Sequence, residues 1–137
     1  MSQEDVELVR RVIEENRSDD LAIRIDSMLA LWAVQCEYVS ILSGVEPQAY
    51  LGRDGIRRYF DDSTTAFARW RTDCDEAREI ASGTVFVTNH FRGIGKRSGA
   101  PVDRQVYGVF VISEGRVAKA HFYPGRDEAL KALGLEE

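Results

Sequence analysis

The stretch "PVDRQVYGVFVISEGRVAKAHFYP", residues Pro101–Pro124, decides the fold. It predicts two strands, Pro101–Ser113 and Arg116–Pro124, joined by a tight hairpin turn at Glu114-Gly115. Side chains alternate between the two faces of a strand. The first strand therefore has two faces, one with Val102, Arg104, Val106, Gly108 and Phe110, the other with Asp103, Gln105, Tyr107 and Val109. The central question is which face lies inside the protein.

Two more strands are predicted just upstream of this hairpin. "DCDEAREIASG" (73–83) alternates as far as Ser82-Gly83, and "TVFVTNHFRGIG" (84–95) follows it. A turn rich in glycine and charge, "GKRSGA", then leads into the hairpin. After the hairpin, "RDEALKALGL" (126–135) predicts a short amphipathic helix with Gly134 in the C-cap position.

The N-terminal half is mainly helical by its periodicity. Apolar residues at helical spacing predict one helix over about 3–13 and a second over about 21–32. A strand is expected at 35–42, followed by a loop over "SGVEPQAY" (43–50). A third helix is predicted with Asp54 as its N-cap and an apolar side formed by Ile56, Tyr59, Phe60, Ser63, Phe67 and Trp70.

The predicted helices come mainly in the first half of the chain, and the strands linked by hairpins come after them. This order of elements indicates the α+β class. We expect a curved antiparallel sheet, wrapped on its concave face by the N-terminal helices into a cone with a mouth, and a short C-terminal helix. Residues 1–137 form one domain in this prediction, since no linker, repeat or low-complexity segment divides the 137 residues.

Composition excludes several classes of function. The formal net charge is −5 and the basic residues are scattered, which argues against a nucleic-acid partner. The charged N-terminus predicts no signal peptide, and no apolar run is long enough to span a membrane, so no membrane partner and a cytoplasmic location are expected. Cys36 and Cys74 are expected to be free thiols, and two histidines, His90 and His121, do not indicate a metal site.

Four segments resemble the SnoaL-like polyketide-cyclase group of the nuclear-transport-factor-2-like superfamily. They are "SQEDVELVRRVIE" near the start, "YLGRDGIRRYF" in the middle, "VISEGRVAKAHFYPGRDEALKALGL" at the end, and the "CEYV" strand where the group often has Val-Glu-Trp. The superfamily also contains ketosteroid isomerase and limonene epoxide hydrolase. The resemblance implies a cystatin-like roll with a pocket between helices and concave sheet, and a homodimer through the outer sheet face.

The resemblance also implies which residues face the pocket. Alignment with ketosteroid isomerase through "ISEGRV" places the oxyanion-binding acid of that enzyme at Gly108 and its general base at Tyr38. The inward residues are then Val85, Val87, Asn89, Phe91, Val102, Arg104, Val106, Gly108, Phe110, Ala120 and Phe122. Neither a glycine nor a tyrosine of ordinary pKa replaces the two carboxyl groups of the isomerase, so both isomerase and cyclase chemistry are in doubt.

Three polar residues are candidates for contact with a ligand, and each has a structural alternative. Tyr38 is either a hydrogen-bond donor to a ligand carbonyl or a core aromatic residue. Asn89 on an apolar face either binds the ligand or is satisfied internally. Arg104 either binds a ligand anion or reaches solvent at the rim of the sheet. Gly108 leaves room for a ligand or for Tyr38.

A one-residue shift of register would exchange the two faces of the sheet. His121, Asp103 and His90 would then enter the pocket, and a histidine would become a credible general base. In the preferred register these three residues lie at a dimer interface.

The expected function is binding of a small, mostly apolar molecule in the cone, with acid–base isomerase, cyclase or hydratase chemistry by Tyr38 and Asn89 as an extension. The alternative is a non-catalytic binding or dimeric scaffolding module of the same fold. No cofactor or metal is expected, because no phosphate-binding loop or ligand cluster is present. The expected ligand-binding residues are Trp32, Tyr38, Phe60, Asn89, Phe91, Arg104, Gly108, Phe110 and Phe122.

Overall fold

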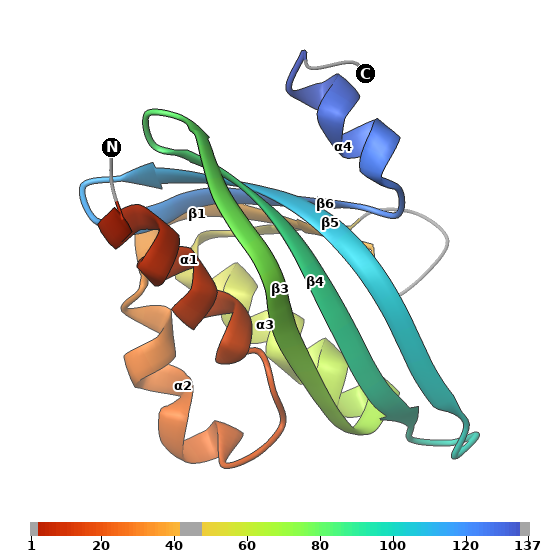
Figure 1. The fold of residues 1–137 in the computed structure, drawn as a ribbon. Helices are drawn as coiled ribbons and strands as arrows, with labels where there is room; N and C mark the ends of the chain where they lie inside the picture. The colour runs from red at the N-terminus through yellow and green to blue at the C-terminus, as the bar shows by residue number, and fades with distance from the viewer. Residues whose placement is uncertain (1–2, 42–47, 135–137) are drawn as a thin grey trace.

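The computed structural model describes residues 3–41 and 48–134. Its elements, in chain order, are α1 (Gln3–Glu14), α2 (Leu21–Leu29), β1 (Trp32–Ser40), β2 (Gln48–Leu51), α3 (Gly52–Ala66), β3 (Phe67–Ala81), β4 (Thr84–Gly95), β5 (Pro101–Ser113), β6 (Arg116–Tyr123) and α4 (Arg126–Ala132). The α+β class, the curved sheet and the short C-terminal helix are confirmed (Figure 1).

The six strands form one sheet in the order β2-β1-β6-β5-β4-β3. Every neighbouring pair is antiparallel except β1 and β6, which are parallel. Register shifts interrupt the β3–β4 pairing at three points, for example between Cys74 and Glu76. Such irregularities increase the local twist and bend a strand, so they contribute to the curvature that makes the sheet concave.

The two faces of the sheet carry separate apolar clusters. Helices α1, α2 and α3 lie on the concave side, whereas α4 lies on the opposite side (Figure 1). The larger cluster joins these three helices to inward residues such as Val87, Phe91 and Phe110. The smaller cluster places Ala129 and Leu130 of α4 against Phe86 and Val109. The even–odd phase expected for β4, β5 and β6 is therefore the one observed.

The third helix is shorter than its apolar spacing predicts. It ends at Ala66, and Phe67 already has extended backbone angles. Phe67 and Trp70 belong instead to β3, where they pair with Gly95 and Gly93. Their spacing fits a helix, but hydrogen bonding to β4 overrides it. Asp54 lies in the first turn, and Leu51, not Asp54, is the N-cap.

The expected loop at 43–50 contains a short strand. Gln48–Leu51 forms β2, which pairs with the end of β1. Residues 43–47 of that loop lie outside the described residues, as does Leu135 of the expected C-terminal helix. The C-cap of α4 is Leu133, not Gly134. Gly134 follows it with a positive φ of 75°, the conformation in which glycine commonly ends a helix.

Candidate functional site

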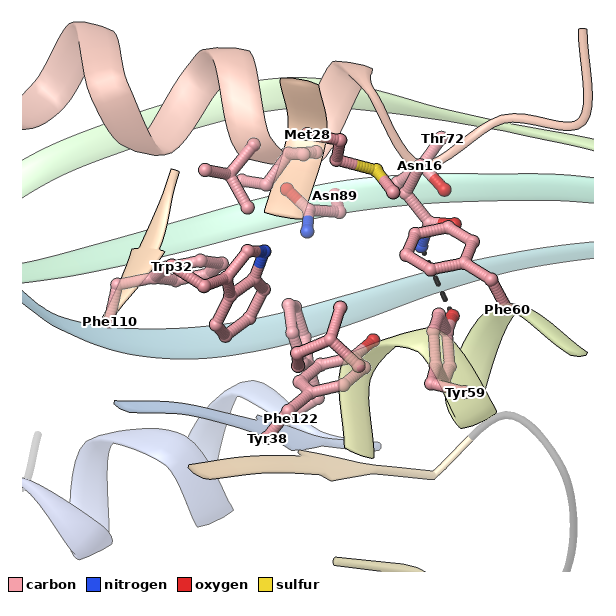
Figure 2. Close-up of a pocket in the computed structure, with 13 residues that line it drawn as sticks. Asn16, Met28, Trp32, Tyr38, Tyr59, Phe60, Thr72, Asn89, Phe110 and Phe122 are labelled. Atoms are coloured by element: carbon pink, nitrogen blue, oxygen red, sulfur yellow. Dashed lines mark hydrogen bonds between the residues drawn. The ribbon is translucent and has the colours of Figure 1, made fainter. Parts of the chain in front are cut away.

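A narrow hollow lies between the three N-terminal helices and the concave face of the sheet (Figure 2). Six of its thirteen lining residues are aromatic, and none carries a charge. The lining residues are Val12, Ile13, Asn16, Met28, Trp32, Tyr38, Ile56, Tyr59, Phe60, Thr72, Asn89, Phe110 and Phe122. The space open to the centres of water-sized molecules is about 30 Å³, room for roughly two waters. A larger guest therefore needs side chains to move.

A second hollow of about 20 Å³ adjoins the first and extends toward Ser40, Ile41 and Phe91. The two hollows share five wall residues, Asn16, Tyr38, Thr72, Asn89 and Phe122. Four of these five carry a side-chain polar group, so the polar groups are concentrated where the hollows meet. A guest that bridges both hollows would meet hydrogen-bonding groups at its middle and apolar walls at its ends.

Asn89 is the most unusual residue at this boundary. Its side chain is 1% exposed, and its Oδ1 has no hydrogen-bond partner. The Oγ1 of Thr72, on the neighbouring strand β3, is also buried without a partner. Figure 2 shows the amide nitrogen of Asn89 and the indole nitrogen of Trp32 turned toward the hollow. Buried polar atoms are rarely left unpaired, so this group points to a guest that supplies the missing hydrogen bonds.

Tyr38 is held in the middle of an aromatic cluster. Its ring meets Tyr59 edge-on at 4.7 Å and Phe122 edge-on at 5.7 Å, and it lies 5.6 Å from Trp32. Burial, followed by the neighbouring Tyr59, raises the pKa of the Tyr38 hydroxyl well above its usual value. The phenol therefore stays protonated at neutral pH, where it acts as a hydrogen-bond donor or acceptor and not as a base.

A chain of hydrogen bonds fixes one end of the hollow. The indole nitrogen of Trp70 donates to Asn16 Oδ1 at 2.9 Å, and Asn16 Nδ2 donates to the Tyr59 hydroxyl at 3.1 Å. Sequence reasoning did not select Asn16, Tyr59 or Thr72 as site residues. Asn16 and Thr72 lie at or beyond the ends of the expected elements, and only the three-dimensional packing brings them to Asn89.

The structure brings together most of the residues expected to bind a ligand. One of them, Phe91, lines the adjoining hollow. Six line the main hollow: Trp32, Tyr38, Phe60, Asn89, Phe110 and Phe122. Gly108 does not leave room for a ligand, because the Phe122 ring fills the space beside its Cα. Arg104 is exposed and lines neither hollow, so its alternative, a side chain that reaches solvent, is the one observed.

The shifted register, which would place histidines in the pocket, is wrong. His90, His121 and Asp103 all lie on the outer face of the sheet. Their cross-strand partners are Gln105 for His90, Val109 for His121 and Arg92 for Asp103. Arg92 donates to His90 Nδ1 at 3.3 Å, so the proton of a neutral His90 is on Nε2, which bonds to Asp103. His121 stacks on Tyr123 at 4.3 Å. The hollow thus has no histidine among its lining residues.

The described residues contain neither a metal-binding cluster nor a membrane-spanning helix. No group of three or more His, Cys, Asp or Glu side chains there is arranged to hold a metal ion. None of the helices in residues 3–41 and 48–134 is long and apolar enough to cross a membrane. Cys36 and Cys74 are free thiols.

Comparison with known proteins agrees with this fold. The family model described as "SnoaL-like domain" matches residues 9–120. No curated protein matches the sequence significantly. An NTF2-like protein of unknown function from Burkholderia pseudomallei is 18% identical over 96% of this chain and 97% of its own, with a TM-score of 0.72.

Two other solved structures share the fold. TerC, co-crystallised with polyporic acid, is 16% identical over 94% of this chain and 99% of its own, with a TM-score of 0.74. A candidate SnoaL-like polyketide cyclase from Jannaschia sp. CCS1 is 16% identical over 90% of this chain and 88% of its own, with a TM-score of 0.69. Identities this low establish the shared fold only. Because the family model covers most of the chain, the protein belongs to the SnoaL-like domain family.

Proposed function

We propose that this domain binds a small, uncharged and mostly apolar molecule that carries a carbonyl or hydroxyl group. The observation that carries the proposal is the Asn89 amide, 1% exposed at the junction of two hollows. Its Oδ1 has no partner and can accept from a hydroxyl, and its nitrogen faces the hollow, where it can donate to a carbonyl (Figure 2). A neutral ligand is favoured because no charged side chain lines either hollow, and a buried charge without a partner is costly.

The roles of the polar groups follow from their protonation. Tyr38 remains a neutral phenol, since burial raises its pKa, and it hydrogen-bonds the ligand together with Asn89. No carboxylate or histidine lines the hollows to take a proton from a ligand. We therefore favour binding and orientation over acid–base turnover. TerC, which shares this fold, was co-crystallised with polyporic acid, which supports binding of a small molecule by this domain.

The two methionines make a direct test possible. Met28 lines the hollow and the other methionine is Met1, so ¹³C-methyl labelling of methionine gives one signal from the site. Titration with cyclohexanone is expected to move the Met28 signal to saturation, whereas cyclohexanecarboxylate at the same concentration leaves it in place. A panel of cyclic ketones and phenols with no effect on Met28 would overturn the proposal.

We also propose that two copies associate through the outer face of the sheet. This face carries the stacked rings of His121 and Tyr123, together with Tyr107 and the partly exposed Val111. These residues suit an interface, because aromatic residues are enriched there. Light scattering is expected to give twice the chain mass, with Tyr123→Glu shifting it to the monomer. A wild-type monomer at high concentration would refute the dimer.

The free Cys36 and Cys74 thiols support a reducing compartment such as the cytoplasm.

A further inference from the structure

An open groove runs along the outside of the hollow, between α2 and α3. It has a volume of about 560 Å³ open to water. Its walls include Leu21, Ala22 and Ile25 from α2, Thr64 from α3 and Trp70 from β3. The groove is much larger than the hollow and is open to solvent, so a small molecule can occupy it without any side-chain movement.

Among the described residues, Phe60 is the one that lines both the groove and the main hollow. Its side chain is 5% exposed, and its ring contacts Tyr59 edge-on at 5.1 Å. The ring therefore separates the two spaces. A rotation of this side chain is the smallest change that would join them.

The two sides of the groove are held with different strength. On the β3 side, the Ser18 hydroxyl accepts a hydrogen bond from the Trp70 backbone N–H at 3.0 Å, and the Trp70 indole bonds to Asn16. Between α2 and α3, Arg57 pairs with Asp26 at 3.1 Å, and both side chains are well exposed. Exposed ion pairs contribute little to stability. The α2 side is thus the side that yields when Phe60 moves.

We propose that Phe60 is the gate of the hollow and the residue that determines which ligands enter it. With the ring in place, the hollow holds about two waters; with the ring turned, the groove and the hollow form one channel that leads to Asn89. This inference rests on the proposed ligand-binding function, but its test requires no ligand.

The test is hydrogen exchange of the Trp32 indole N–H with solvent, followed by NMR. This group faces the hollow, and the chain has only one other tryptophan, so its signal is readily assigned (Figure 2). Exchange requires water to reach the hollow, so its rate reports the open population. The backbone amide of Val87, which is fully buried, serves as the reference for global unfolding.

Two pairs of variants separate gating from general loosening. Phe60→Leu is expected to speed Trp32 exchange at least tenfold relative to Val87. Phe110→Leu also removes a ring from the wall, but at the sheet side, and is expected to leave that ratio within about twofold. Ala22→Trp fills the groove and is expected to slow exchange, whereas Ile23→Trp, placed at an 82% exposed position of the same helix, is expected not to.

If Phe60→Leu and Phe110→Leu accelerated exchange of the Trp32 indole N–H equally, the gate proposal would be refuted. An exchange rate unchanged by Ala22→Trp would also refute it. Neither result would bear on ligand binding, which the Met28 titration decides separately. If Phe60→Leu failed to fold, the Ala22→Trp and Ile23→Trp pair alone would decide the question. Slower exchange only in Ala22→Trp would support the gate, and equal rates would refute it.

Discussion

The ring of Phe122 occupies the space beside Gly108. A Cβ added to Gly108 would lie 2.6 Å from Cε1 and 2.8 Å from Cδ1 of Phe122, closer than side chains pack. The two residues face each other across β5 and β6. The absence of a side chain at Gly108 thus serves the packing of Phe122, whose ring in turn forms part of the hollow's wall.

Gly108→Ala is therefore expected to destabilise the protein by about 1–3 kcal/mol, as overpacking does. Phe122 has little freedom to move, since Tyr38 and Phe110 each meet its ring edge-on at 5.7 Å. Urea denaturation measures the effect. In the double variant Gly108→Ala/Phe122→Leu the cost is expected to be less than the sum of the single costs, and additivity would contradict the steric explanation.

Asn89→Leu is expected to leave stability unchanged or to raise the free energy of unfolding by about 1 kcal/mol. The reason is that it removes a buried oxygen without a partner, while leucine has a similar volume. Thr88→Val is the matched control, because Thr88 Oγ1 is also buried without a partner but lies outside both hollows. Both variants are expected to be stable, and only Asn89→Leu to lose affinity for cyclohexanone. A loss of more than 2 kcal/mol in Asn89→Leu would show a structural role instead.

Tyr38 is expected to make stability depend on pH in alkaline solution. The pKa of Tyr38 is 10.0 in the unfolded chain and higher in the folded protein. At pH values between these two pKa values, the unfolded chain has lost the Tyr38 proton and the folded protein still holds it. The stabilisation is complete below about pH 10 and is lost as the pH rises further. Tyr38→Phe removes this contribution, so its stability is expected to fall less steeply above pH 10 than that of the wild type. Parallel curves, measured by urea denaturation from pH 8 to 11, would show that Tyr38 is not the group responsible.

The outer-face pair His90–Asp103 is expected to have no influence on the hollow. The hydrogen bond from His90 lowers the pKa of Asp103, so His90→Ala is expected to raise this pKa toward 3.8, as measured by ¹³C NMR of the carboxyl group. The affinity of the same variant for cyclohexanone is expected to equal that of the wild type. A weakened affinity would mean that this pair communicates with the site through the sheet.

Much of the architecture was predictable from the sequence because alternation fixes the two faces of a strand. The phase read from "TVFVTNHFRGIG" places Val87, Asn89 and Phe91 inward, as observed. Periodicity failed at Phe67 and Trp70, where spacing suited to a helix belongs to a long strand. Arg104 has the inward parity but is exposed near the start of β5, so parity alone did not determine its burial.

The site was less predictable than the fold. Asn89 stood out as a polar residue on an apolar face, whereas nothing in the local sequence marks Asn16 or Thr72 as its neighbours. They meet because α1 packs on β3 and β3 pairs with β4, contacts between segments far apart in the chain. The role of Gly108 likewise depends on one ring from the next strand.

The most direct measurement compares two guests of nearly equal shape, cyclohexanone and methylenecyclohexane, by titration of the Met28 methyl signal. A hydrogen bond between neutral groups contributes about 0.5–1.5 kcal/mol, so the wild type is expected to prefer the ketone by roughly 2- to 12-fold. In Asn89→Leu the preference is expected to shrink to what the Tyr38 hydroxyl alone supplies. An equal preference for the ketone in both proteins would contradict the assignment of Asn89 as the polar anchor of the site.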